Sequence, residues 1–233
     1  VLLTPYNKQM LSNNAGVYGD CYDEFHKRYL KSIASSDIQI MWDIESLLEV
    51  QKNVYGKYCP DSTIVSNRTV EPFYFDNPWS NHLKGKKVLV ISPFTDSIIK
   101  QYPNRDKIWV DKDILPTFEL STYKNIQSIG GIGPHNNWVE SIEFMEEGIG
   151  KLDFDIAILG CGAYGMPLSD YIKNKMGKSA IYVGGGLQLM FGISGKRWDN
   201  HEVIRKYFNN SWVRPHNTET PSKSETVEGG CYW

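Results

Sequence analysis

Hydrophobic and polar positions follow one another in blocks that predict strands and helices in turn. Short apolar runs predict buried strands at residues 38–42, 87–92, 154–159 and 180–183, with shorter ones at 108–110 and 125–129. Apolar residues at helical spacing predict helices from about residue 20 to 33, after residue 95, around Trp138 to Ile149, and from Leu168 to Met176. The segment 59–83, rich in Pro and Asn, predicts loop and short strand pieces. Alternating strands and helices predict a Rossmann-like α/β fold, a largely parallel sheet flanked by helices in a single domain over residues 1–233.

Glycine-rich turns follow two of the predicted strands. The strand at 154–159 runs into Gly160, Gly162 and Gly165, and the strand at 180–183 ends on Gly184, Gly185 and Gly186. Glycine lets a backbone approach a ligand closely, and the N–H groups at a helix start can hold a phosphate. A third turn follows Ser92, where Thr95 or Asp96 could cap a helix. In a parallel sheet these turns share one edge, so we expect a nucleotide site there, with tight helix packing as the alternative.

The spacing of Gly160, Gly162 and Gly165 matches a dinucleotide fingerprint in the expected strand-to-helix context. Such a site also needs an acidic residue about 20 positions further on, to hold the ribose hydroxyls. Gly184, Gly185 and Gly186 occupy that place. A dehydrogenase is therefore disfavoured, and so is a methyltransferase that needs an acid at the next strand end.

Basic and aromatic side chains follow the second glycine turn. Lys196 and Arg197 can balance phosphate charge, and Trp198 or Tyr164 could stack on a nucleotide base. Gln188, two positions after the last of these glycines, is included as a binding candidate. The alternatives are a solvated basic pair and aromatic rings that only pack.

Candidate acids and bases stand near other element ends. Asp43 and Glu45 follow the strand at 38–42, and two such carboxylates suit Mg²⁺ or Mn²⁺ bridging a diphosphate. The alternative is that Asp43 caps a helix. For the base that accepts a proton from an acceptor hydroxyl, the candidates are Asp43, Glu45, His135 and Asp20.

Longer motifs in the second half of the chain resemble a known enzyme group. These are residues 160–168 (GCGAYGMPL), 184–188 (GGGLQ), 191–199 (FGISGKRWD), 212–215 (WVRP) and 228–233 (EGGCYW). Together they are similar to GT-D-like glycosyltransferases of bacteria and viruses, over about the last 110 residues well and the first 120 loosely. The resemblance implies transfer of a sugar from a nucleotide-sugar donor, most plausibly a UDP-sugar, to a glycan or glycoconjugate acceptor in polysaccharide biosynthesis. The group carries an acidic D-x-E element near its amino terminus, whereas residues 12–16 (SNNAG) hold no carboxylate here.

Composition narrows the class of protein. With 41% apolar residues in 233, the chain can bury a core of its own, and a net charge of -2 without a basic stripe gives no attraction to nucleic acid. Its four scattered cysteines indicate free thiols and a cytoplasmic location, and no apolar run is long enough to span a membrane. The start at Val1-Leu2-Leu3, without methionine, favours a domain cut from a longer polypeptide with other enzyme domains.

The last segment, residues 215–233, is a polar tail with an aromatic end. Tyr232 and Trp233 are costly to leave in water, so we expect them to dock on the domain, with Arg214 and Glu219 near the ligand or acceptor. A disordered linker is the alternative. Two other functions stay open: another nucleotide-dependent enzyme such as a methyltransferase, and a catalytically silent glycan-binding module.

Overall fold

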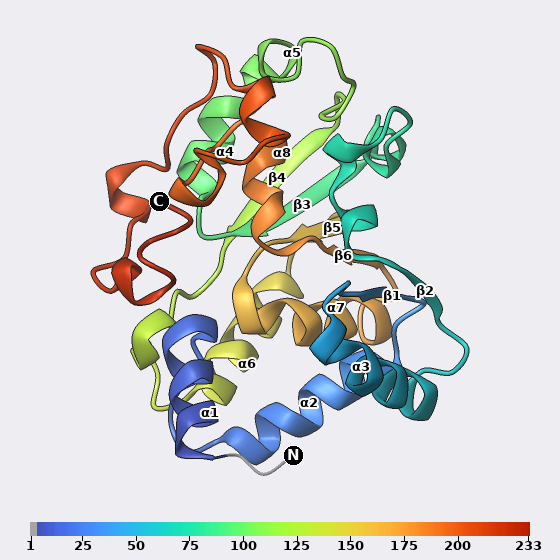
Figure 1. Cartoon of the computed structure of the whole chain (residues 1–233), viewed down its shortest axis with the longest axis vertical. Coiled ribbons are helices and arrows are strands. Elements are labelled where there is room, and N and C mark those ends of the chain that lie inside the picture. The colour runs from blue at the N-terminus through green and yellow to red at the C-terminus, as the bar shows by residue number, and fades with distance from the viewer. Residues whose placement is uncertain (1–3) are drawn as a thin grey trace.

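Two parallel sheets with helices around them make up the computed structural model (Figure 1). It describes residues 4–233, so the apolar start Val1-Leu2-Leu3 lies outside the described part. The larger sheet contains β3 (Lys87–Ser92), β4 (Glu119–Lys124), β5 (Ile156–Leu159) and β6 (Ser179–Tyr182), in the order β4-β3-β5-β6. The smaller one pairs β1 (Ile38–Met41) with β2 (Thr63–Ser66). The predicted α/β class with parallel sheets flanked by helices is confirmed.

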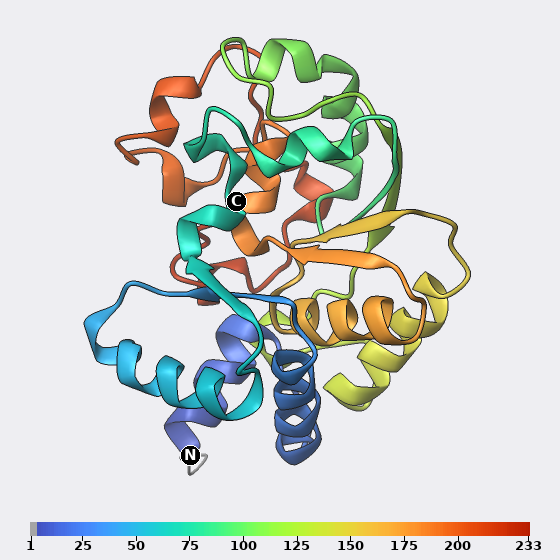
Figure 2. The ribbon, with the colours of Figure 1, turned by 90° about the vertical axis from the view of Figure 1, so that its right-hand side faces the viewer.

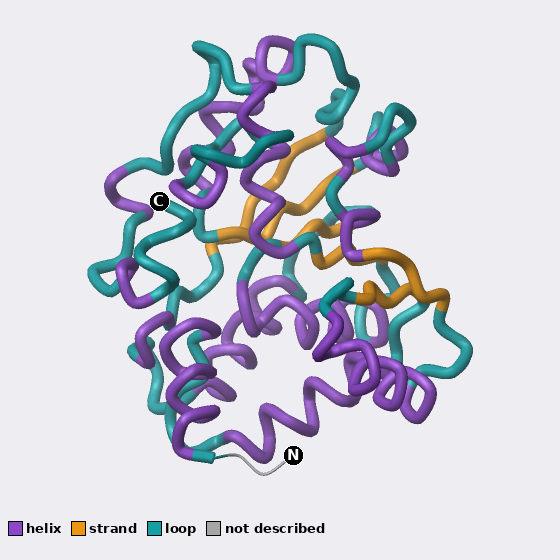
Figure 3. Tube along the Cα trace, viewed as in Figure 1, coloured by secondary structure: helices purple, strands orange, loops and turns teal. Residues whose placement is uncertain are grey.

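The alternation of side chains along β3 divides the core into two layers. Val88 and Val90 point into one apolar cluster, and Leu89 and Ile91 into the other, all of them fully buried. The first cluster contains residues of α4 (Thr95–Gln101) and α8 (Leu187–Met190). The second contains residues of α6 (Trp138–Ile149) and α7 (Gly165–Asn174), with α2 (Tyr22–Ala34) packed outside. Figure 3 shows helices on both sides of the strands.

The order of the strands places a topological switch in the middle of the sheet. From β3 the chain moves outward to β4, then returns to the other side of β3 to form β5 and β6. The connections after β3 and β5 therefore leave in opposite directions. In open parallel sheets such a point, at the carboxyl ends of the strands, is where ligands bind. The prediction that the turns after Ser92, Gly160 and Gly184 share one edge is confirmed by this register.

The remaining helices surround this frame. They are α1 (Pro5–Met10), a π-type turn Leu11–Ala15, α3 (Glu45–Tyr58) and α5 (Arg105–Ile108). Figure 2 views the side on which α3 and the two-stranded sheet lie. Short 3₁₀ turns lie at Asn67–Val70, Pro72–Tyr74, Trp79–Leu83, Tyr102–Asn104, Ile129–Gly131, Gly162–Tyr164, Gly184–Gly186, Lys196–Trp198, Ile204–Tyr207, Asn217–Glu219 and Ser224–Thr226. Within residues 4–233, no helix has the length and apolar character needed to cross a membrane.

Several predicted details are wrong. Residues 108–110 do not form a strand, because Ile108 is the last residue of α5. Trp109 is buried, and its indole N–H donates to the Met190 carbonyl at 2.9 Å. The strand expected at 125–129 lies earlier, as β4. Neither Thr95 nor Asp96 caps α4, whose N-cap position is Phe94. The N-cap of α3 is Ile44 without a side-chain bond, so Asp43 is not the cap.

Candidate binding site at the carboxyl edge of the sheet

The glycine turns after β5 and β6 touch one another. A Cβ added to Gly160 would lie 2.8 Å from the Gly184 carbonyl oxygen and 3.0 Å from Leu187 Cβ, so only glycine permits this contact. Gly162, with φ of 57°, and Gly184, with φ of 73°, adopt the left-handed conformation that glycine tolerates best. The two turns therefore form one continuous backbone surface beside the switch point.

The segment expected to correspond to the missing acidic element lies beside this surface. The Ser128 hydroxyl donates to the Gly16 carbonyl at 2.6 Å and lies 2.7 Å from the Tyr164 hydroxyl. A Cβ on Gly162 would lie 3.6 Å from the Ala15 carbonyl oxygen. The end of the segment 12–16 thus reaches the first glycine turn through backbone carbonyls, and the segment holds no carboxylate.

Both aromatic rings that were candidates for base stacking are buried. Tyr164 lies face to face with Trp138, with ring centres 5.3 Å apart, and burial raises the pKa of its hydroxyl. Trp198 packs against Tyr232 with ring centres 6.0 Å apart. Tyr164 is 2% and Trp198 5% exposed, so neither ring has a free face at the carboxyl edge of the sheet. The prediction that one of them stacks on a nucleotide base is therefore corrected. Gly165 serves packing as well, since the Tyr182 ring fills the place of its Cβ.

A carboxylate that the sequence reading missed lies on the second glycine turn. A Cβ on Gly186 would lie 2.5 Å from Glu71 Oε1, and Gly186 has an ordinary helical φ of -62°. Close approach of Glu71, and not backbone conformation, therefore explains this glycine. Burial raises the pKa of the Glu71 carboxyl, and the positive charges of Arg68 and Arg197 oppose that rise. Its only sequence signal is the charged pair Arg68 and Glu71 in a segment read as loop.

Lys196 and Arg197 face the tail (residues 215–233). The Lys196 ammonium lies 3.1 Å from a Glu225 carboxylate oxygen. Arg197 pairs with Glu228 and stands over the Tyr232 ring, 4.8 Å from its centre. The basic pair therefore makes ion pairs with acidic side chains of the tail and stays exposed to solvent, as in the alternative of a solvated pair.

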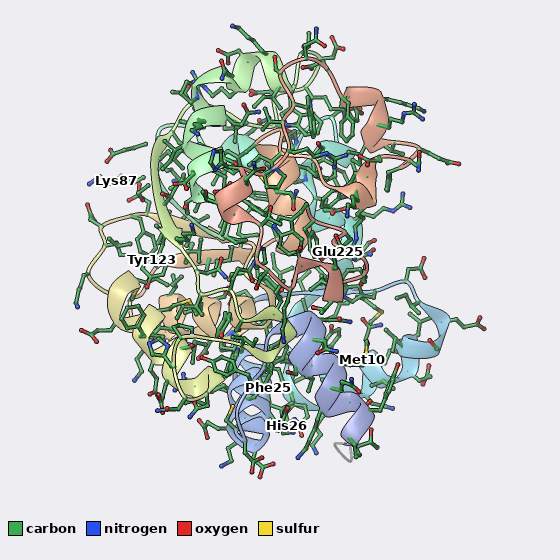
Figure 4. The ribbon with its side chains drawn as sticks, turned by 90° about the vertical axis from the view of Figure 1, so that its left-hand side faces the viewer. Met10, Phe25, His26, Lys87, Tyr123 and Glu225 are labelled. Carbon is green, nitrogen blue, oxygen red and sulfur yellow. The ribbon has the colours of Figure 1, made fainter. Side chains whose placement is uncertain are left out.

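The tail crosses the carboxyl edge from one layer to the other. Figure 1 shows it (red) running along the left side from the layer of α4 toward α1. The Glu219 carboxylate accepts the backbone N–H of Asp96 at 2.8 Å and of Ser97 at 3.2 Å, and Lys223 reaches the Gly130 carbonyl at 3.4 Å. In Figure 4, Glu225 lies above Met10 of α1, while Lys87 at the start of β3 lies on the opposite side.

Aromatic and amide side chains fix the end of the tail. Trp233 donates its indole N–H to the Glu219 carbonyl at 2.9 Å, and its ring meets Phe94 edge-on at 6.2 Å. The Tyr232 ring fills the place of a Cβ on Gly185. Gln188 donates to the Tyr232 carbonyl at 3.1 Å, so this candidate residue holds the tail. Glu219 is 4% exposed, and its carboxylate is bonded to the start of α4. Arg214 forms an ion pair with Asp199 at 2.5 Å.

The candidate acids and bases are not gathered at the glycine turns. Asp43 and Glu45 follow β1 of the smaller sheet and are exposed. His135 lies before α6, where its Nδ1 is 2.9 Å from the Ser141 hydroxyl and its ring packs against Phe144. Ser92 is buried, and its hydroxyl accepts the Phe94 N–H at 3.2 Å.

No described group of three His, Cys, Asp or Glu side chains is placed to hold a metal ion. Two carboxylates suffice for Mg²⁺ when water and substrate phosphates complete its coordination. Asp43 and Glu45 fit that requirement by chemistry, and water and substrate phosphates would complete the coordination of an ion there.

The cavities found lie away from the carboxyl edge. One of about 360 Å³ lies between the ends of α2 and α3, lined by Ala34, Ser36, Asp37, Tyr58, Cys59, Pro60, Asp61 and Ser62. Another, of about 610 Å³, is lined by Asn200, Glu202, Arg205 and Lys206. Neither is lined by the glycine turns. In the second turn, Tyr232 of the tail lies against Gly185 and Glu71 lies against Gly186. All four cysteines are free thiols, and burial raises the pKa of Cys161 in the first turn.

No family model, no curated protein and no solved structure matches this chain.

Proposed function

We propose that the protein is a glycosyltransferase with a Rossmann-like fold, which moves a sugar from a nucleoside diphosphate donor, a UDP-sugar, to a glycan acceptor. One observation carries the proposal: two glycine turns in contact at the switch point of a parallel sheet, with Lys196 and Arg197 close by. Backbone N–H groups and cationic side chains are what a diphosphate needs. The motifs of residues 160–168 and 184–188 that resemble GT-D-like enzymes are these same turns.

The chemistry follows from the charge of the leaving group. In the net glycosyl transfer the acceptor hydroxyl oxygen bonds to the anomeric carbon and gives its proton to a base, while the bond from that carbon to the diphosphate oxygen breaks and the nucleoside diphosphate leaves with the electron pair. Lys196 and Arg197 would stabilise that charge once their contacts with Glu225 and Glu228 give way to the ligand. Asp43 and Glu45 follow β1 of the smaller sheet, so a divalent ion held by them would supply Lewis-acid stabilisation only to a diphosphate that extends from the glycine turns to that sheet. Asp43, Glu45, His135 and the exposed Asp20 remain the candidate bases.

The test is binding and turnover with a panel of donors. Calorimetry with UDP should show saturable binding, and Arg197→Gln should weaken it about tenfold while a matched surface variant, Lys206→Gln, leaves it unchanged. Release of UDP from UDP-sugars, with and without glycan acceptors, then reports transfer. UDP binding without turnover would favour a silent binding module. No UDP binding by the folded protein would refute the donor assignment.

One observation favours a second candidate, another nucleotide-dependent enzyme such as a methyltransferase. The Glu71 carboxylate lies against Gly186 in the turn that follows β6, and nicotinamide and S-adenosylmethionine sites carry an acid near the end of the corresponding strand. Thermal shifts with UDP, S-adenosylmethionine and nicotinamide dinucleotides separate the two candidates, because only the true ligand raises the melting temperature at concentrations above its Kd.

A further inference from the structure

The end of β6 holds a carboxylate that its own sequence does not supply. In a nucleotide-binding strand-helix-strand unit, an acidic side chain at the end of the second strand binds the ribose hydroxyls. Here β5, the first glycine turn, α7 and β6 make up such a unit, and β6 pairs with β5 in parallel. Its expected acidic position is occupied by Gly184, Gly185 and Gly186.

Glu71 fills that position from a distant part of the chain. It stands between two 3₁₀ turns, Asn67–Val70 and Pro72–Tyr74, and its Oε1 reaches the place that a Cβ of Gly186 would take. Any larger residue at 186 would push the carboxylate away. Glycine at 186 leaves space beside the backbone, and the Glu71 carboxylate occupies that space.

The carboxylate is half-buried and has no bonded partner among the described residues. Only burial and the more distant charges of Arg68 and Arg197 act on its proton affinity, without a hydrogen bond. Three tail carboxylates near this edge, those of Glu219, Glu225 and Glu228, all have hydrogen-bonding or ionic partners. Oε1 thus faces the second glycine turn, and neither carboxylate oxygen accepts a hydrogen bond from a described residue.

We propose that Glu71 binds the ribose of a nucleoside-bearing ligand, with the 2′- and 3′-hydroxyls donating to its two carboxylate oxygens. A cis-diol matches a carboxylate in geometry, and bonds to an ionised acceptor are about twice as strong as neutral ones. The positive charges of Arg68 and Arg197 favour the ionised carboxylate and oppose the rise in its pKa that burial causes. The inference rests on the proposed function only in taking a nucleotide as ligand; it does not depend on sugar transfer.

The experiment compares ligands that differ only in the ribose. Calorimetry on the full chain measures UDP and 2′,3′-dideoxy-UDP with wild type, with Glu71→Gln and with Glu119→Gln. Glu119 begins β4, at the opposite edge of the sheet, and serves as the matched control. Wild type and Glu119→Gln should prefer UDP by at least about tenfold, and Glu71→Gln should reduce that preference to about threefold or less. Circular dichroism confirms that each variant is folded.

The outcomes separate this inference from the proposed function. If UDP binds but the preference survives in Glu71→Gln, the ribose role is overturned and the donor assignment stands. If UDP fails to bind, S-adenosylmethionine and NAD⁺ are titrated with the same variants. Binding of either that weakens about tenfold in Glu71→Gln supports the ribose role without the glycosyltransferase. Failure of all three to bind to wild type overturns the inference.

Discussion

Arg197 stands over the ring of Tyr232, 35 positions further along the chain, with its guanidinium carbon 4.8 Å from the ring centre and Nη1 3.1 Å from the hydroxyl. Attraction between a guanidinium and an aromatic face is strongest where water is partly excluded, as it is here. This contact joins the candidate phosphate-binding strip to the end of the tail. Changes in the tail should therefore alter both stability and ligand binding.

Removal of the aromatic end should destabilise the domain. Tyr232 and Trp233 are partly buried against the cluster of α4 and α8, so deletion of residues 229–233 should lower the free energy of unfolding by about 2–4 kcal/mol. For a chain of this size each kcal/mol corresponds to about 2–4 °C in melting temperature. Calorimetric melting measures the loss, and Val110→Ala, at a residue 71% exposed, is the matched control. An unchanged melting temperature after deletion would mean that the tail is a dispensable linker.

Charge removal in the tail should strengthen donor binding. Glu228 pairs with Arg197, and a ligand phosphate would have to displace it. Since exposed pairs contribute at most about 1 kcal/mol, Glu228→Gln should improve UDP affinity up to about fivefold, with a smaller gain at high salt. Glu147→Gln, which frees Lys151 on the far α6 surface, controls for net charge. Equal affinities of Glu228→Gln and wild type would place the phosphates away from Arg197.

Local periodicity was enough to predict the elements whose burial depends on one face. The strand 87–92 and the helix around Trp138 to Ile149 match β3 and α6, because continuous apolar runs and helical spacing arise from local geometry. The strand predicted at residues 108–110 is wrong because Trp109 is buried without being in a strand. Its ring packs face to face on Phe73, with ring centres 5.7 Å apart. An apolar run of three does not distinguish a strand from a buried loop.

Only the local features of the candidate site could be predicted from the sequence. Glycine turns are local, so the contact between the loops at Gly160 and Gly184 followed from the predicted sheet. Glu71 was not found, because its importance lies in its closeness to Gly186, which no local pattern reports. Tyr164 and Trp198 were predicted to stack on a base, but the residue type alone does not show whether an aromatic ring is buried in the core or exposed in a binding site.

The conformation of Gly162 should make it intolerant of any side chain. Its φ of 57° costs a non-glycine residue about 1–2 kcal/mol, so Gly162→Ala should lower stability by that amount and disturb the first turn. Gly56 is the matched control, since it lies inside α3 with open space around its Cβ position. There alanine should raise stability by up to about 1 kcal/mol. Urea unfolding compares the two, and equal effects of both substitutions would contradict the argument.

Metal removal tests the role of Asp43 and Glu45. If they hold Mg²⁺ or Mn²⁺ in sugar transfer, EDTA should abolish turnover, added Mn²⁺ should restore it, and Asp43→Asn should reproduce the loss. Asp111→Asn, another exposed aspartate, should remain active. Full turnover in EDTA would instead leave Lys196, Arg197 and the backbone N–H groups to stabilise the leaving diphosphate.

The raised pKa of Glu71 should appear as a pH-dependent cost to stability. Below the ordinary glutamate pKa of 4.5, the carboxyl is protonated in folded and unfolded chains alike, and its ionisation contributes nothing to stability. As pH rises through that value toward the higher folded pKa, the unfolded chain releases its proton first, so the wild type loses stability. Glu71→Gln escapes this loss because its amide stays neutral. Urea unfolding should therefore show Glu71→Gln to be more stable than wild type at about pH 7, and the difference should shrink toward about pH 4. If the stability difference between Glu71→Gln and wild type instead grows toward acid pH, the pKa of Glu71 is not raised by burial.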